Sequence, residues 1–300
     1  MIVHKHNGWL IIDKPLSMTS SDVVQKVRKS FGMRKVGHAG TLDPLATGVL
    51  PIALGEATKT VQFAMEATKT YRFKVVWGEE RTTDDLEGEV LQTSTLRPCE
   101  SEILAVIKKF TGNIQQVPPI YSAIKVNGKR AYALARADEE VVLSARTVTV
   151  ERIDLISAED KDFSEFEVVC GKGTYIRSLA RDIGRVLGCL GHISYLRRTQ
   201  VGPFYEKDAY LLNKVIAAGQ NCANYLLTID AVLDDIPAIL FEDEFIQKLR
   251  WGQEVSLPLQ NDASEKGETS LVLCKSQQGQ LVAIARRNGS KLRVARGFNL

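Results

Sequence analysis

The amino-acid sequence predicts an α+β fold in two domains, and three observations support this. The chain has 300 residues, enough for one large domain and a second, small one. Segments with strand-like alternation recur along it, with only a few helical segments between them. From residue 241 onward, short apolar runs alternate with turn residues, which favours a small β-rich domain. We therefore expect domains over residues 1–237 and 238–300.

The first part of the chain predicts strands and helices in turn. The expected strands cover residues 9–13, 49–54 and 69–77, and the expected helices cover residues 20–31, 60–65 and 101–110. Ser20 or Ser21 can cap the first helix, whose apolar side chains recur at helical spacing up to Gly32. Within the third strand, apolar and polar side chains alternate, which places Tyr71 on the side that faces the core.

The second part of the chain continues this mixture. The expected strands cover residues 147–156, 163–170, 192–201, 270–274 and 280–285. A helix is expected over residues 175–187, because its apolar side chains share one face, and it carries Arg177 and Arg181 one turn apart. Around residues 221–237 the pattern is helical and then breaks.

Residues 117–144 lack a regular period and contain Pro118, Pro119 and Gly128. The segment is also basic, with Lys125, Lys129, Arg130 and Arg136. Because connections this long usually have a function, we interpret it as an inserted arm. An ordinary connector is the alternative.

The composition is that of a globular protein, with 44% hydrophobic and 25% charged residues. No apolar run approaches the ~20 residues that span a bilayer. The first residues lack the apolar core of a secretory signal, so we expect a cytoplasmic protein without membrane association. Five cysteines, odd in number and never spaced as Cys-x-x-Cys, argue against a disulfide framework and a zinc site. No metal is expected.

The formal net charge is only +3, but the basic residues are segregated. Residues 269–300 contain six basic residues and no acidic one, and residues 20–40 contain five basic residues and only Asp22 as an acid. Such segregation is typical of a face that binds phosphates. A solvated surface with chance clustering is the alternative.

The loop from Gly37 to Pro51 is the most informative segment. It combines three glycines and two prolines with a single carboxylate, Asp43, which Leu42 and Leu45 flank. Glycine allows close approach of the backbone and proline fixes it, so the loop is suited to hold one group in place. Taken alone, an Asp before a Pro more often caps a turn.

Six segments together resemble the motifs of the pseudouridine synthases, in the branch that modifies uridine 55 of tRNA. In chain order they are Gly8–Pro15, Gly37–Pro51, Lys69–Phe73, Pro119–Lys125, Gly171–Arg177 and Tyr195–Arg198. They span roughly residues 8 to 202 and are more specific together than any one of them. The resemblance implies a mixed, largely antiparallel sheet in the catalytic domain, with an inserted arm and a small PUA-like β-rich C-terminal domain.

The resemblance also implies a reaction: isomerisation of uridine to pseudouridine in the T stem-loop of tRNA, after extrusion of the base, with no cofactor. Asp43 would be the catalytic carboxylate, acting either covalently on the nucleotide or by stabilising an oxocarbenium-like sugar. Arg177 would be its partner, as a bidentate guanidinium. Tyr71 would stack on the uracil and move a proton.

Four further residues carry over as substrate contacts. Tyr175 and Leu196 would line the uracil pocket, and His38 would contact the extruded nucleotide rather than transfer protons. Lys14 would be a structural residue or lie near a phosphate. No guide RNA is expected, because the basic arm would grip the tRNA directly, and nothing demands more than a monomer.

Three alternatives remain at this stage. A guide-RNA-dependent relative shares the catalytic motifs. In a non-catalytic RNA chaperone, the Asp43 loop would be purely structural. A nucleoside hydrolase or glycosidase would need a second carboxylate across from the first, and the nearest acids in the matching segments are Asp13 and Glu56.

Overall fold

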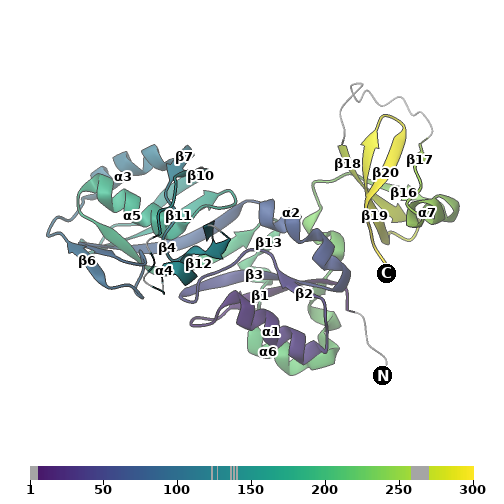
Figure 1. Cartoon of the computed structure of the whole chain (residues 1–300), viewed down its shortest axis with the longest axis horizontal. Helices are drawn as coiled ribbons and strands as arrows, with labels where there is room; N and C mark the ends of the chain where they lie inside the picture. The colour runs from purple at the N-terminus through teal and green to yellow at the C-terminus, as the bar shows by residue number, and fades with distance from the viewer. Residues whose placement is uncertain are drawn as a thin grey trace.

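The structure is a computed structural model that describes residues 6–122, 124–126, 128–135, 137, 139, 141–257 and 270–300. Arg136, which the sequence analysis assigns to the arm, lies outside them. The predicted α+β fold is confirmed: a large mixed sheet carries helices on its faces, and a smaller sheet stands at one end of the molecule (Figure 1). No helix among the described residues is long and apolar enough to cross a membrane.

The large sheet has eleven strands and is mostly antiparallel, as the resemblance implies. Its main order is β14 (Tyr210–Leu211), β1 (Gly8–Lys14), β3 (Ala46–Leu54), β12 (Gly191–Val201), β4 (Lys69–Trp77), β11 (Phe163–Cys170), β10 (Arg146–Ser157) and β7 (Gly112–Gln116). Three short strands attach to this path: β2 (Val36–His38), β13 (Phe204–Tyr205) and β15 (Leu226–Leu227). The parallel pairing of β12 with β3 places Leu196 opposite Ala46, the first residue of β3 and three residues after Asp43.

The helices around this sheet are α1 (Ser20–Phe31), α2 (Val61–Glu66), α3 (Glu100–Ile107), α5 (Ile176–Leu187) and α6 (Leu212–Ala218). Figure 1 shows α1 and α6 side by side below β1 and β3, and their apolar faces share one core cluster with these strands. Helices α3 and α5 bury a second cluster against β4 and β11. Short 3-10 helices complete the chain: η1 (Gly55–Thr60), η2 (Lys108–Phe110), η3 (Glu206–Asp208), η4 (Gly219–Tyr225) and η5 (Ile229–Val232).

Two local predictions are wrong. Helix α1 is capped by Thr19, which forms a capping box with Asp22, and not by Ser20 or Ser21. The regular helix expected around residues 221–237 is replaced by 3-10 turns, and α6 precedes them. Helix α6 has only two buried residues, Leu212 and Val215, which are too few for an apolar period in the sequence to predict a helix.

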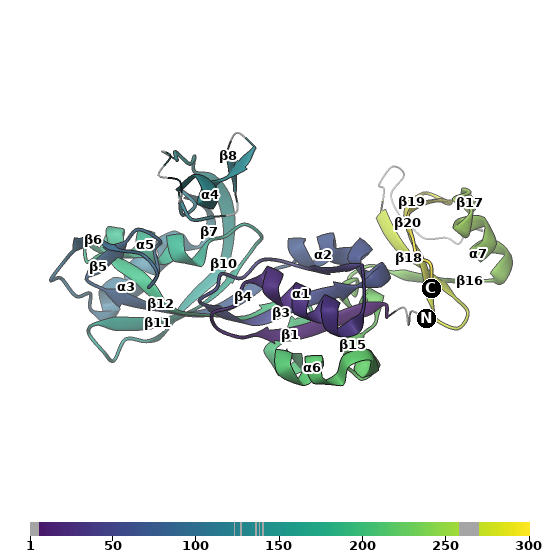
Figure 2. The same ribbon diagram turned by 60° about the horizontal axis from the view of Figure 1, so that its bottom comes forward.

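The arm connects β7 to β10, whose ends pair at Gln116 and Arg146. It therefore leaves and re-enters the sheet at one point, and Figure 2 shows its strand β8 (Lys125–Val126) and helix α4 (Ala131–Ala135) standing away from the sheet. Strand β9 (Lys129–Arg130) pairs with β8. The segment predicted as irregular thus contains a hairpin and a short helix.

The C-terminal region is β-rich, as predicted. Its five-stranded sheet runs β16 (Ala238–Phe241), β18 (Ser270–Ser276), β19 (Leu281–Asn288), β20 (Lys291–Gly297) and β17 (Val255–Ser256). Helix α7 (Asp243–Arg250), absent from the sequence prediction, packs on one face of this sheet. The other face contributes Leu273, Ile284 and Phe298 to a core cluster with Trp9 and Val49 of the large sheet. Strands β5 (Glu79–Arg81) and β6 (Val90–Thr93) form a separate hairpin at the opposite end of the molecule (Figure 1).

Candidate active site

The backbone on both sides of Asp43 is anchored, which positions its carboxylate. The hydroxyl of Ser20 donates to the carbonyl of Leu42 (3.1 Å) and accepts from its N–H (2.8 Å). The carbonyl of Pro44 accepts from the N–H of Ser17 at 2.9 Å. Ser20 therefore holds the Asp43 loop, and this role explains why it does not cap α1. The Asp43 side chain itself stays 39% exposed, so a substrate can reach it.

Arg177 is the direct partner of this carboxylate. Its side chain is only 6% exposed, and its Nε lies 3.0 Å from Oδ2 of Asp43. The expected bidentate pair does not form, because the other nitrogens are engaged elsewhere. Nη1 donates to the carbonyl of Thr83 at 2.9 Å, and Nη2 donates to the carbonyl of Tyr121 at 3.0 Å. Arg177 is thus held by two carbonyls, and its Nε forms an ion pair with Asp43 that lacks the geometry of a hydrogen bond.

Asp85 is a second carboxylate at the same pocket, and the sequence analysis missed it. Its Oδ2 lies 3.6 Å from Nη1 of Arg177, and its Oδ1 accepts from the hydroxyl of Thr83 and from the N–H of Glu87. Because its side chain is 7% exposed and its oxygens have partners, Asp85 holds the arginine and is not poised across a glycosidic bond. No motif in the matching segments contains it.

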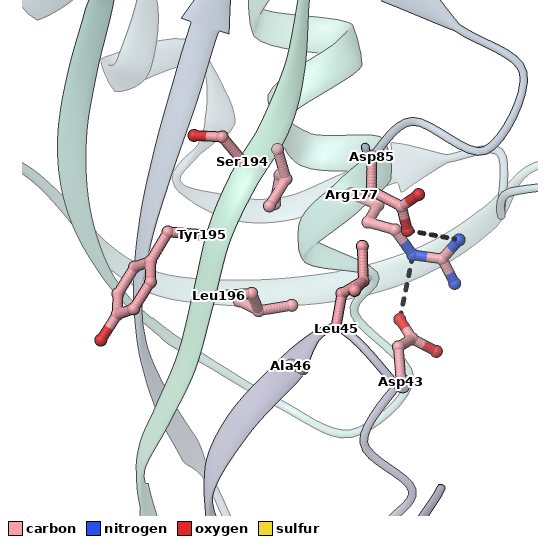
Figure 3. A pocket seen from close by; sticks show the side chains of 9 residues that line it. Asp43, Leu45, Ala46, Asp85, Arg177, Ser194, Tyr195 and Leu196 are labelled. Atoms are coloured by element: carbon pink, nitrogen blue, oxygen red, sulfur yellow. Dashed lines mark ion pairs between the residues drawn. The ribbon is translucent and has the colours of Figure 1, made fainter. Parts of the chain in front are cut away.

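The pocket beside Asp43 has mostly apolar walls. Figure 3 shows Leu196 pointing from β12 toward Leu45 and Asp43, whereas Tyr195 points to the opposite side of the strand. The residues that line the pocket are Asp43, Leu45, Ala46, Asp85, Arg177, Ile193, Ser194, Tyr195 and Leu196. Leu196 therefore lines the pocket beside Asp43. Tyr175 is not among these lining residues; it is the residue before α5, at the edge of the site.

Tyr71 lies on β4 opposite Arg198 of β12 and packs against the core clusters on both sides. Burial raises the pKa of its phenol, while a hydrogen bond with Arg198 acts in the opposite direction. Tyr71 is therefore protonated at neutral pH and can donate a proton.

Arg198 is a buried cation that the sequence analysis did not single out as a functional residue. It is 1% exposed and donates to the carbonyls of Val49 (2.7 Å) and Gly40 (3.0 Å). Gly48 is required beside it, since a Cβ there would lie 2.2 Å from the Arg198 carbonyl. Arg198 thus joins both ends of the Asp43 loop to Tyr71.

Lys14 is fully buried, and its ammonium group donates to the carbonyls of Pro15 (2.8 Å), Met18 (2.6 Å) and Pro44 (3.2 Å). An ammonium group has three donors, so none remains for a phosphate. Of the two roles considered for Lys14, the structural one fits this geometry, and direct substrate contact does not. Burial lowers its pKa to about 8, and the nearby charge of Asp43 partly opposes that shift.

His38 ends β2 and is half-buried at the start of the Asp43 loop. Burial lowers its pKa, and the neighbouring Arg198 lowers it further. The ring is therefore neutral at physiological pH. A neutral ring is compatible with the contact expected for His38 and disfavours a role as a proton donor.

The two acids considered for a hydrolase are engaged elsewhere. Asp13 forms a two-point ion pair with Arg197, both distances being 3.0 Å. Glu56 binds Lys59 and the N–H of Asn299, and so joins the C-terminal sheet to the large one. Neither lines the pocket. Among the described residues, no three His, Cys, Asp or Glu side chains are grouped so that they could hold a metal ion.

Comparison with known proteins gives consistent matches over the chain. Residues 28–176 match the N-terminal domain of the TruB family of pseudouridylate synthases, and residues 177–238 match a tRNA pseudouridylate synthase B C-terminal domain. The "tRNA pseudouridine synthase B" of Rhodospirillum rubrum is 48% identical, over 98% of this chain and 97% of its own. Its namesake from Bradyrhizobium diazoefficiens is 47% identical, over 98% of this chain and 86% of its own.

Solved structures support the same fold. A chain from a Cbf5–Nop10–Gar1 complex matches with a TM-score of 0.75 and 27% identity, over 99% of this chain and 86% of its own. The matched family ranges end at residue 238, so the domain division at residues 237 and 238 stays a prediction. With identities near one half over nearly the whole chain, this protein belongs to the TruB family of pseudouridylate synthases.

Proposed function

We propose that this chain converts uridine 55 in the T loop of tRNA to pseudouridine without a guide RNA. The observation that carries the chemistry is the ion pair in which buried Arg177 holds the accessible carboxylate of Asp43 beside an apolar pocket. The choice of substrate is supported by the names of the most similar relatives listed above.

The reaction breaks the bond between C1′ of the ribose and N1 of the base and forms one between C1′ and C5. A proton leaves C5 and another is taken up at N1, so electrons balance and no cofactor is required. Asp43 is the nucleophile, and Arg177 keeps its carboxylate anionic and oriented. Leu196 gives apolar contact to the detached uracil, and Tyr71 stacks on it, a contact worth ~1–3 kcal/mol.

The substrate base must leave the RNA to enter this site. A uridine inside a folded T loop is stacked, and Asp43 lies at a pocket walled by Leu45, Ala46 and Leu196. Extrusion of the base costs a few kcal/mol, and contacts between the pocket and the uracil offset that cost. His38 and Tyr175 are the residues that we propose contact the extruded nucleotide.

Residues 238–300 form the proposed RNA-binding domain. Of the six basic residues noted there, Lys275 pairs with Asp230 and Lys291 with Glu254. Arg286 and Arg293 lie directly opposite each other on β19 and β20, and both are exposed. Two arginines side by side repel each other, so an anion between them is stabilising.

Replacing both arginines, Arg286→Ala with Arg293→Ala, should weaken tRNA binding and leave turnover at saturating tRNA unchanged. The slope of log affinity against log salt should fall by up to about 2, since each lost phosphate contact reduces it by roughly 0.9. A salt titration of binding measures this. Lys291→Ala is the matched control, because Lys291 already has a carboxylate partner. An unchanged slope in the double variant would assign RNA binding elsewhere.

Deleting the C-terminal region is a poorer test of RNA binding. Its side chains Leu273, Ile284 and Phe298 belong to the same core cluster as Trp9, and deletion would expose that apolar surface. A truncated chain could therefore lose binding simply because it unfolds. Substituting the exposed Arg286 and Arg293 avoids this ambiguity, because neither side chain belongs to the core.

Nucleoside analysis of an unmodified tRNA transcript, incubated with the purified protein alone, tests the proposed function. Pseudouridine at position 55 is the expected product. Free uracil would indicate a hydrolase, and tight binding without product would indicate a guide-RNA requirement or a chaperone. A transcript with cytidine at position 55 is the control for site selection.

A further inference from the structure

Residues 116–122, which comprise the last residue of β7 and the first segment of the arm (here the arm root), are bound to helix α5 and the residue before it at three points. Two of them come from Arg177 and Arg181, which lie one turn apart and are both buried. Arg177 binds the carbonyl of Tyr121, and Arg181 donates from Nη2 to the carbonyl of Val117 at 2.8 Å. Helix α5 therefore holds the arm root through buried guanidinium groups.

The third point is the side-chain amide of Gln116. It donates to the carbonyl of Tyr175 at 3.1 Å and accepts from the N–H of the same residue at 2.8 Å. Gln116 is 2% exposed, so both bonds lie away from water. Since Tyr175 immediately precedes α5, Gln116 fixes the start of the arm root against the start of the helix.

Arg181 also connects the arm root to the turn that supports Arg177. Its Nη1 lies 2.9 Å from Oδ2 of Asp84, and its Nε lies 2.9 Å from Oδ1 of Asp182. Asp84 has a left-handed backbone (φ 61°), and its carbonyl accepts from the N–H of Ile193 at 3.0 Å. That turn, with Thr83 and Asp85, supplies two other partners of Arg177.

Arg181 does not touch Asp43 and does not line the pocket. Two of its nitrogens, Nη1 and Nη2, bind the residue 83–85 turn and the arm root, the two segments from which Arg177 takes its own partners. Displacement of either segment would move Tyr121 or Thr83 away from Arg177 and release the guanidinium that orients Asp43. The contacts of Arg181 therefore act on the nucleophile through a neighbour.

We propose that Arg181 is a positioning residue for the reaction. Together with Gln116 it fixes the arm root on α5, so that the carbonyl of Tyr121 completes the surroundings of Arg177 and Arg177 holds Asp43 in its reactive orientation. This inference rests on the proposed function, because Asp43 must be the nucleophile for its orientation to matter.

The variant Arg181→Lys tests the proposal. Lysine keeps the positive charge beside Asp84, so no buried carboxylate is left unpaired. A lysine lacks the planar fork that reaches Asp84 and Val117 together. We expect the single-turnover rate at saturating tRNA to fall about 10- to 100-fold, with tRNA affinity within about 3-fold of wild type, the range that a mispositioned catalytic group produces. Gln116→Ala should give the same pattern.

Arg185→Lys is the matched control. Arg185 lies one turn further along α5 and forms a two-point ion pair with Glu80, at 2.8 and 2.6 Å. It has no contact with the arm root among the hydrogen bonds and ion pairs of the described residues. Because the Arg185 side chain is 53% exposed, the control should lower the unfolding temperature less than Arg181→Lys does, and it should leave the rate within about 2-fold.

Two different results would contradict the two proposals, so failure of the inference can be distinguished from failure of the proposed function. A wild-type rate in Arg181→Lys, with only its unfolding temperature lowered, would make Arg181 a structural residue and overturn the inference alone. Absence of pseudouridine with the wild-type protein would overturn the proposed function and the inference with it.

The double variant that combines Arg181→Lys with Gln116→Ala is a further test. Its loss of single-turnover rate, expressed as free energy, should be smaller than the sum of the losses in the two single variants, since both substitutions act on one segment.

Discussion

Asp43→Asn is expected to abolish pseudouridine formation, with a loss of at least about 10⁴-fold, as for other catalytic groups of this kind. The amide is nearly isosteric with the carboxylate but is a poor nucleophile and carries no charge. Because Asp43 is 39% exposed and its backbone is held by Ser20, the variant should fold normally. Nucleoside analysis after prolonged incubation of a tRNA transcript measures the effect.

Binding of tRNA should survive this substitution. Most of the affinity for RNA comes from phosphate contacts, and Asp43 contributes none. Removing the negative charge of Asp43 leaves Arg177 with one carboxylate partner at the pocket, Asp85. If Asp43→Asn lost tRNA binding as well as turnover, Asp43 would be a determinant of RNA binding and the assigned role would be wrong.

Tyr71→Leu is expected to slow the reaction by two to four orders of magnitude. Loss of stacking accounts for ~1–3 kcal/mol, which corresponds to roughly 5- to 150-fold. Loss of a positioned proton donor contributes about 10²-fold or more. The measurement is the single-turnover rate at saturating tRNA, compared with the unfolding temperature of the same variant.

Tyr71→Phe separates the two contributions. The ring remains, so stacking and core packing are kept, while the hydroxyl beside Arg198 is lost. We expect a rate between those of wild type and Tyr71→Leu, at a nearly unchanged unfolding temperature. Near-normal rates for both variants would show that Tyr71 is a packed core residue and takes no part in the reaction. Tyr210→Phe, on a tyrosine that packs edge-to-face on Tyr225, controls for loss of a hydroxyl as such.

Much of the fold could be predicted because its signals are local. Apolar alternation in residues 69–77 and the helical apolar face of residues 176–187 are properties of neighbouring residues. The elements that prediction missed include α6, α7 and β2, none longer than eight residues, and the capping of α1. Whether such a short element forms, or which residue caps a helix, depends on a single hydrogen bond or a few buried contacts. Several adjacent residues in the sequence could supply that hydrogen bond or those contacts.

The sequence by itself determined the family and the principal candidates, because the loop around Asp43 and the five other segments keep recognisable residues. Only the tertiary structure decided what surrounds them. Arg198 contacts Val49 and Gly40, about 150 positions away along the chain, because β12 pairs with β3. Asp85 reaches Arg177 because the turn of residues 83–85 lies against helix α5. A buried charge thus finds its partners on segments that are far apart along the chain, which no local pattern of residues encodes.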